Sequence, residues 1–87
     1  MAAFAILTQA PNAELERNIA TAYKDRWHGL SENAWLVADT NKTTQEVCQA
    51  LNIKPGSISA IVLKIDSYFG AAQPSIWDWL KVKGVGP

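Results

Sequence analysis

Three segments that are apolar at almost every position constrain the fold more than any other feature of this sequence. They are residues 2–8 (AAFAILT), 34–38 (AWLVA) and 59–65 (SAIVLKI). Short apolar runs between turn-forming residues are typical of buried strands. Successive side chains of a strand point to opposite faces, so each of these strands is apolar on both faces. A sheet built from them needs cover above and below.

Two amphipathic helices are predicted between the strands. The first begins after the capping residue Asn12 and ends near Arg26. Its apolar stripe, at helical spacing, consists of Leu15, Ile19, Ala22 and Tyr23. The second helix is short, because a capping box from Thr43 to Glu46 opens it and Asn52 ends it.

A hairpin or a sharply bent strand pair is predicted between the two helices. Residues 27–30 and 34–38 flank the polar break 31–33, and Gly29 suits a β-bulge. The elements therefore follow the order strand, helix, strand, strand, helix, strand. Because crossover connections are right-handed, the commonest solution is the ferredoxin-like βαββαβ sandwich, an α+β fold with one antiparallel sheet and two helices on one face.

A short C-terminal helix is predicted as an addition to this fold. Pro74 opens it, with Ser75 as its cap, and it carries two of the four tryptophans. Residues 84–87 have no reason to be ordered. A chain of 87 residues is the size of one domain, so we expect a single ferredoxin-like domain over residues 1–83 and a disordered tail.

The charge balance of the chain argues against two classes of partner. Eight Lys and Arg residues are matched by eight Asp and Glu residues, so the chain lacks the basic surface that nucleic-acid phosphates or anionic membranes attract. The one cysteine cannot form an internal disulfide and suits a reducing compartment. The first apolar run is too short for a secretory signal or a membrane span, so we expect a soluble cytoplasmic protein.

The second face of the sheet leads to a prediction about assembly. The C-terminal helix or a second copy of the sheet can cover it, and we expect both to contribute, which gives a symmetric homodimer. The alternative is that the C-terminal helix closes the face alone and the protein is a monomer. The expected interface residues are Ala5, Leu7, Trp35, Leu36, Trp77 and Trp79.

No set of residues in the sequence marks a catalytic centre or a metal site. His28, the only histidine, could act as a general base oriented by Asp25 or Glu32. No nucleophile accompanies it, which favours a structural place at a sheet edge or a dimer seam, where protonation would make assembly depend on pH. Cys48 has no basic neighbour in sequence and is predicted to be an inert thiol. We expect no cofactor and no enzymatic activity.

Two further groups of side chains have weaker functional interpretations. Asp39 and Asp66 follow strands that run the same way, with the first strand between them, so about 10 Å separates them. That is too far to share one metal ion, and each carboxylate is interpreted as a solvated loop residue. Trp35, with Tyr68 and Phe69, could stack nucleobases. The basic residues are scattered among acids, which favours core and interface roles for these aromatic rings.

The apolar and aromatic pattern of the chain resembles one known family. The pattern comprises Phe4–Thr8, Leu15–Tyr23, Trp27–His28 with Ser31, Ala34–Val37, Ile65–Ala72 and Ile76–Leu80. It is similar to small bacterial proteins often labelled SinR-like, which are distantly similar to the dimeric CRISPR-associated endoribonucleases. The resemblance covers most of the chain and implies a ferredoxin-like fold and a dimer, but no settled activity.

The same resemblance bears on nuclease chemistry. The nuclease relatives place an aspartate at the end of the first strand, where two copies meet around a divalent metal, and hard cations need carboxylate or carbonyl oxygens. This chain has Thr8-Gln9-Ala10 there, and a neutral amide is a poor ligand for a catalytic Mg²⁺.

We therefore expect a non-enzymatic interaction or assembly protein that acts as a homodimer. The resemblance alone suggests a link to phage, mobile-element or defence systems. The alternative is a metal-dependent nuclease or a nucleic-acid-binding module. A third possibility, a small-molecule sensor at the dimer seam, has no sequence feature in its favour.

Overall fold

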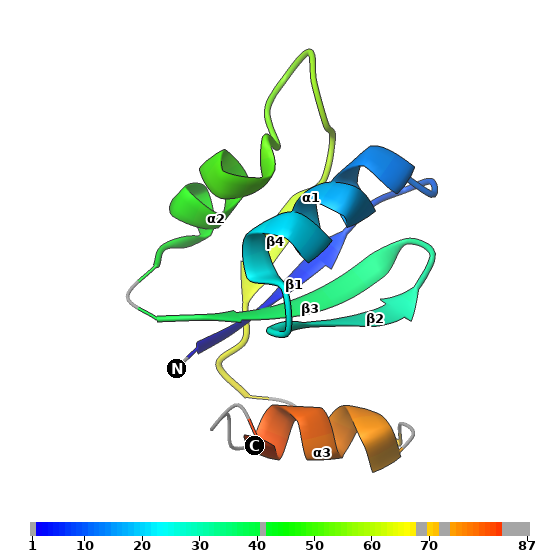
Figure 1. Cartoon of the computed structure of the whole chain (residues 1–87), viewed down its shortest axis with the longest axis vertical. Coiled ribbons are helices and arrows are strands. Elements are labelled where there is room, and N and C mark those ends of the chain that lie inside the picture. The colour runs from blue at the N-terminus through cyan, green and yellow to red at the C-terminus, as the bar shows by residue number, and fades with distance from the viewer. Residues whose placement is uncertain (1, 41, 68–69, 72–73, 83–87) are drawn as a thin grey trace.

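The computed structural model describes residues 2–40, 42–67, 70–71 and 74–82 (Figure 1). Its elements are β1 (Ala2–Leu7), α1 (Ala13–Tyr23), β2 (Trp27–Ser31), β3 (Ala34–Asp39), α2 (Thr44–Leu51), β4 (Ile61–Lys64) and α3 (Pro74–Val82). The predicted order of strands and helices is confirmed, including the hairpin of β2 and β3 and the added C-terminal helix. The predicted disordered tail, residues 84–87, lies outside the described residues.

The four strands form one antiparallel sheet in the order β2-β3-β1-β4. β1 therefore lies between β3 and β4, while β2 and β4 are the edge strands. Ala5 of β1 is opposite Leu36 of β3 and Leu63 of β4, and Phe4 is opposite Val37. Directly opposite side chains lie on the same face of a sheet, so this register sorts the side chains between the two faces.

Side chains cap α1 and α2 at their N-termini, as the sequence predicts. Asn12 caps α1 by accepting a hydrogen bond from the Leu15 N–H at 2.9 Å. The helix ends at Tyr23, a few residues earlier than predicted. At the start of α2, the Thr43 hydroxyl accepts from the Glu46 N–H at 3.1 Å, and the Glu46 carboxylate accepts from the Thr43 N–H at 2.9 Å. This is the predicted capping box.

Two predicted boundaries are wrong. The last strand is Ile61–Lys64 and not 59–65, because β1 ends at Leu7, which is the partner of the first residue of β4. The C-terminal helix begins at Pro74, so Ser75 lies inside its first turn and is not the cap. The fixed φ of proline suits the first position of a helix, which explains the earlier start.

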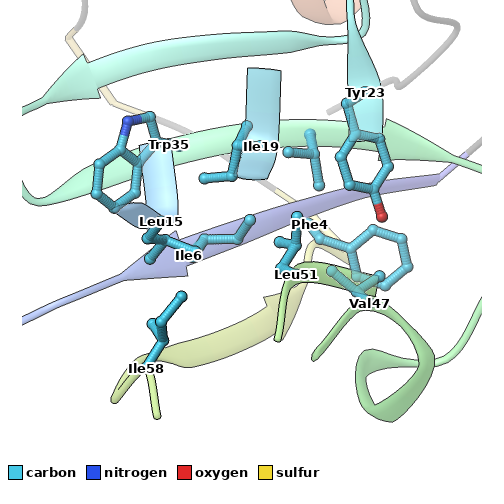
Figure 2. Close-up of a cluster of buried hydrophobic side chains, with 10 residues drawn as sticks. Phe4, Ile6, Leu15, Ile19, Tyr23, Trp35, Val47, Leu51 and Ile58 are labelled. Carbon is cyan, nitrogen blue, oxygen red and sulfur yellow. The ribbon is translucent and has the colours of Figure 1, made fainter. Parts of the chain in front are cut away.

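One face of the sheet carries the main hydrophobic core, between β1 and β3 on one side and α1 and α2 on the other (Figure 2). Its buried side chains are Phe4, Ile6, Leu15, Ile19, Tyr23, Trp35, Val37, Val47, Leu51 and Ile58. The Trp35 indole N–H donates a hydrogen bond to the Glu16 carboxylate at 3.1 Å, so the large ring is buried with its polar atom paired. Burial of this set is the main hydrophobic contribution to the stability of the fold.

The helix α3 covers part of the opposite face, on the far side of the sheet from α1 and α2 (Figure 1). Ala3 and Leu36 of the sheet are buried together with Leu80 of α3, and Trp79 packs beside them. The second apolar face is thus covered in part by the same chain. No described helix has the length and apolarity of a membrane-spanning segment.

Candidate interaction surface

Three large apolar side chains remain exposed on the α3 side of the sheet, beyond the reach of that helix. Leu7 is opposite Ile61 across the β1–β4 ladder, and Leu63 follows two positions later on the same face of β4. Their side chains are 38%, 60% and 49% exposed, respectively. We call these three residues the β1–β4 patch. Contiguous exposed apolar surface on a soluble chain is typical of a site of interaction.

The patch adjoins the sheet edge at β4, whose outward main-chain groups have no partner strand among the described residues. The Ile65 N–H donates to the Ala3 carbonyl of β1 at 2.9 Å. Main-chain groups alternate in direction along a strand, so Ile65, Leu63 and Ile61 direct theirs toward β1. Val62 and Lys64 therefore direct their N–H and carbonyl groups away from the sheet. An open edge of this kind is a template for pairing with another strand.

The structure distributes the predicted interface residues unevenly. Leu7 is exposed in the patch, while Ala5 is half-buried beneath α3 and Leu36 is only 5% exposed there. Trp79 is half-buried on α3 itself. The side chain of the remaining α3 residue in the predicted set, Trp77, lies outside the described part of the structure.

Trp35 lies on the other face of the sheet. It is opposite Ile6, and α1 covers both, so its ring is only 1% exposed and belongs to the core of the chain itself (Figure 2). The predicted interface residues did not include Ile61 and Leu63, which are the most exposed members of the patch. Their signal was present in the sequence, because the alternation of the last strand places both on one face.

His28 meets α3 on the partly covered face. It lies in the edge strand β2, as predicted, opposite Leu36. A register shift, the predicted bulge, follows directly after Gly29. The imidazole and the indole of Trp79 are 6.0 Å apart between centroids and inclined by 40°. The indole N–H of Trp79 is buried and has no hydrogen-bond acceptor among the described residues, which indicates that α3 docks by shape more than by polar pairing.

Candidate catalytic groups do not assemble into a centre within the described part of the chain. Among those residues, no group of three or more His, Cys, Asp or Glu side chains is close enough to hold a metal ion. β1 separates β3, which ends at Asp39, from β4, which precedes Asp66, as the sequence predicts. Cys48 is half-buried, and this burial raises the pKa of its thiol, so it is less reactive than an exposed cysteine at neutral pH.

Tyr23 is the described residue whose pKa departs most from its ordinary value. The ring is 2% exposed, and its hydroxyl has no hydrogen-bond partner among the described residues. Burial, followed by the nearby negative charge of Asp39, raises the pKa of Tyr23 to about 12, while Arg26 opposes that rise. The guanidinium carbon of Arg26 lies 5.5 Å from the ring centroid. A phenol that stays protonated at neutral pH is no base.

An open hollow of about 610 Å³ borders the patch at the end of β1. Its lining consists of Leu7, Thr8, Gln9, Ala10, Pro11, Asn12, Ser57, Ser59, Ala60 and Ile61. These residues provide amide and hydroxyl groups but no charged side chain, so the hollow has neither an acid nor a base for proton transfer. The hollow adjoins the patch through Leu7 and Ile61, while most of its other lining residues are polar.

Comparisons of the chain with protein-family models, with curated proteins and with solved structures give no match. The case for a function therefore comes from the surface itself.

Proposed function

We propose that this protein is a non-enzymatic interaction protein that acts as a homodimer. The β1–β4 patch carries the proposal, because three large apolar side chains lie together beside an open sheet edge. Removing such surface from water is favourable by about 25 cal/mol per Å². A second copy of the chain brings an identical patch, which a symmetric dimer can cover on both sides at once.

The charge of the chain supports self-association. The formal net charge is zero, with eight positive and eight negative side chains. Two copies therefore approach without long-range repulsion, and a net charge near zero promotes association. The same balance weakens the nucleic-acid alternative, because binding to phosphates draws most of its affinity from clustered positive charge.

We further propose that the domain has the ferredoxin-like βαββαβ arrangement. The strand order β2-β3-β1-β4 with antiparallel neighbours supports this assignment, as do two helices on one face. The resemblance to SinR-like proteins, and the link to phage, mobile-element or defence systems that it suggests, stay part of this proposal. A cytoplasmic location belongs to it as well, since one free cysteine suits a reducing compartment.

The second candidate is a metal-dependent nuclease, and the end of β1 argues against it. The residues there are Thr8, Gln9 and Ala10, which supply no carboxylate. A catalytic Mg²⁺ is held through carboxylates in most protein sites. Cleavage of RNA or DNA that needs Mg²⁺ or Mn²⁺ and stops with EDTA, in a highly purified sample, would overturn the non-enzymatic assignment.

Light scattering on a size-exclusion column tests the dimer. Over a wide concentration range the mass should rise from that of one chain, 9.5 kDa, toward twice that value. The double variant I61T/L63T removes most of the apolar patch from side chains that are already exposed, so the fold should tolerate it. Its dimer dissociation constant should be at least about tenfold higher than that of the parent.

Leu30→Thr is the matched control for that variant. Leu30 is 41% exposed but belongs to β2, the opposite edge of the sheet, so this change should leave the dimer intact. A parent protein of single-chain mass at every concentration contradicts the proposal. A dimer weakened equally by Leu30→Thr would place the interface elsewhere.

A further inference from the structure

The edge strand β4 specifies how two copies can meet. We propose that two chains pair their β4 strands side by side and antiparallel, about a two-fold axis that passes beside Val62. The two four-stranded sheets then become one continuous sheet. This inference rests on the proposed homodimer and adds the strand, the direction and the register of the contact.

The direction of the main-chain groups restricts the register. Only residues that direct their N–H and carbonyl groups away from β1 can bond to a second copy, and these are Val62 and Lys64. Ala60, just before β4, has the same parity. Shifting the register between the two copies by one residue would place an outward main-chain group of one copy opposite a residue of the other whose groups already bond to β1. Such a register is therefore excluded.

Several registers satisfy that condition, but only one pairs all three outward residues with one another and covers the patch. With Val62 opposite Val62 of the second copy, all three outward residues are paired, because Lys64 faces Ala60. Ile61, the most exposed member of the patch, then faces Leu63 of the second copy. A register centred on Leu63 sets Ile61 against Ile65, which packs against the residues under α3, so it pairs fewer of these outward groups and leaves less room. A register centred on Ile61 sets Leu63 against the polar Ser59, and one centred on Lys64 sets the two lysines against each other.

The side chains on both faces of β4 are compatible with the register that sets Val62 opposite Val62. Ile61 and Leu63 of the two copies form closely spaced cross-strand apolar pairs. Leu7, opposite Ile61 within each chain, flanks these pairs. On the other face Lys64 meets Ala60 and not a second Lys64, so no like charges are directly opposed.

The lack of protection of the β4 edge and the surface area available for burial both favour a second copy of the chain as the partner. Natural edges are blunted by charge, proline or a covering segment, and the one charged side chain of β4, Lys64, lies on the face away from the patch. The chain has 5516 Å² of accessible surface. Burying about a tenth of it on each copy gives roughly 1,100 Å² in total, near the lower limit for specific interfaces. The dimer is thus expected to be reversible.

A matched pair of variants at Lys64 tests the strand pairing. The Lys64 N–H points away from β1, so Lys64→Pro removes a bond between copies and none within the sheet. Lys64→Ala removes the charge and keeps the N–H. We expect Lys64→Pro to raise the dimer dissociation constant about tenfold or more, and Lys64→Ala to change it by less than about threefold.

Cysteine cross-linking tests the register and does not depend on the proline variant folding. In a Cys48→Ser background, the pair I61C/L63C should form disulfide-linked dimers under mild oxidation, because non-hydrogen-bonded neighbours have the required spacing. Leu63→Cys alone should link slowly. Rapid linking of Leu63→Cys alone would mean that the axis passes beside Leu63, which overturns the proposed register.

The outcomes separate this inference from the function on which it rests. A parent chain that is monomeric at all concentrations removes both. A dimeric parent whose Lys64→Pro variant dimerises as well as Lys64→Ala, with no link in I61C/L63C, keeps the homodimer and removes the β4 pairing. Weakened dimerisation of Lys64→Pro with efficient linking of I61C/L63C supports the pairing in this register.

Discussion

The two faces of the one sheet are built from different side chains and do different things. On the face covered by α1 and α2, the sheet contributes Phe4, Ile6, Trp35 and Val37, all 0–1% exposed. On the face covered by α3, β1 and β3 contribute mostly alanines, with Leu36 as the one large side chain of these two strands that is buried there. Large side chains interdigitate with those of a covering helix, whereas alanines present a smooth surface.

Under the proposed homodimer, this difference separates stability from association. The face with large side chains binds its two helices through a closely packed core, where lost volume is costly. The alanine face lets a short helix lie close to the sheet with few contacts, and it leaves the indole N–H of Trp79 without a partner among the described residues. The same face ends in the exposed β1–β4 patch, so the more weakly covered side is the one that we expect to meet a second copy.

Substitution of a leucine on the closely packed face should give the largest effect. Leu15 is fully buried among the core side chains of α1 and the sheet (Figure 2). Leu15→Ala removes that volume and leaves a cavity, which should lower the free energy of unfolding by about 3–5 kcal/mol. Denaturation in guanidinium chloride, followed by circular dichroism, measures the loss. A loss below about 1.5 kcal/mol would mean that this core is loosely packed.

High pH should weaken the same face through Tyr23. Its phenol has a pKa of about 12 in the folded chain, against an ordinary value of 10.0. The folded state therefore keeps its proton more tightly than the unfolded state. The resulting stability is complete below pH 10 and is lost as pH rises toward 12, by at most about 2–3 kcal/mol.

Tyr23→Phe isolates that effect, because other groups also titrate at high pH. The variant should lack the part of the stability loss that comes from this phenol. Plots of the free energy of unfolding against pH for the parent and the variant should therefore diverge above pH 10. At neutral pH the variant should be equal or slightly more stable, since it removes a buried hydroxyl with no partner among the described residues. Parallel pH profiles for the parent and the variant would contradict the assigned pKa.

Local signals explain how much of the fold could be predicted from sequence. Asn12 and the pair Thr43 and Glu46 satisfy main-chain groups within a few residues of themselves, so their patterns identify helix starts without tertiary information. The hairpin of β2 and β3 is equally local. The start of β4 was misjudged because it depends on where β1, distant in sequence, stops.

The assignment of side chains to faces needed long-range information. Alternation grouped Trp35 with Val37 correctly, but nothing in the sequence states which of the two faces α1 and α2 will cover. Trp35 was therefore expected at an interface and lies in the core. The exposure of Ile61 and Leu63 also depends on which face α1 and α2 cover, and on how much of the other face α3 can cover.

Substitution of a leucine on the alanine face should give the smallest effect and completes the comparison. Leu80 of α3 is 2% exposed, nearly as buried as Leu15. Its neighbours are Ala3 and Leu36 of the sheet, together with half-buried residues of α3. A short helix that contacts a smooth face can shift to close a cavity, and the cost of a cavity depends on how far its site can collapse. Leu80→Ala should therefore lower the free energy of unfolding by about 2 kcal/mol, near the lower limit for a buried leucine.

The measurement is the one used for Leu15→Ala, denaturation in guanidinium chloride followed by circular dichroism. Equal losses for the two variants would show that both faces are packed equally well, and the proposed division between a stabilising face and an associating face would then have no basis in packing.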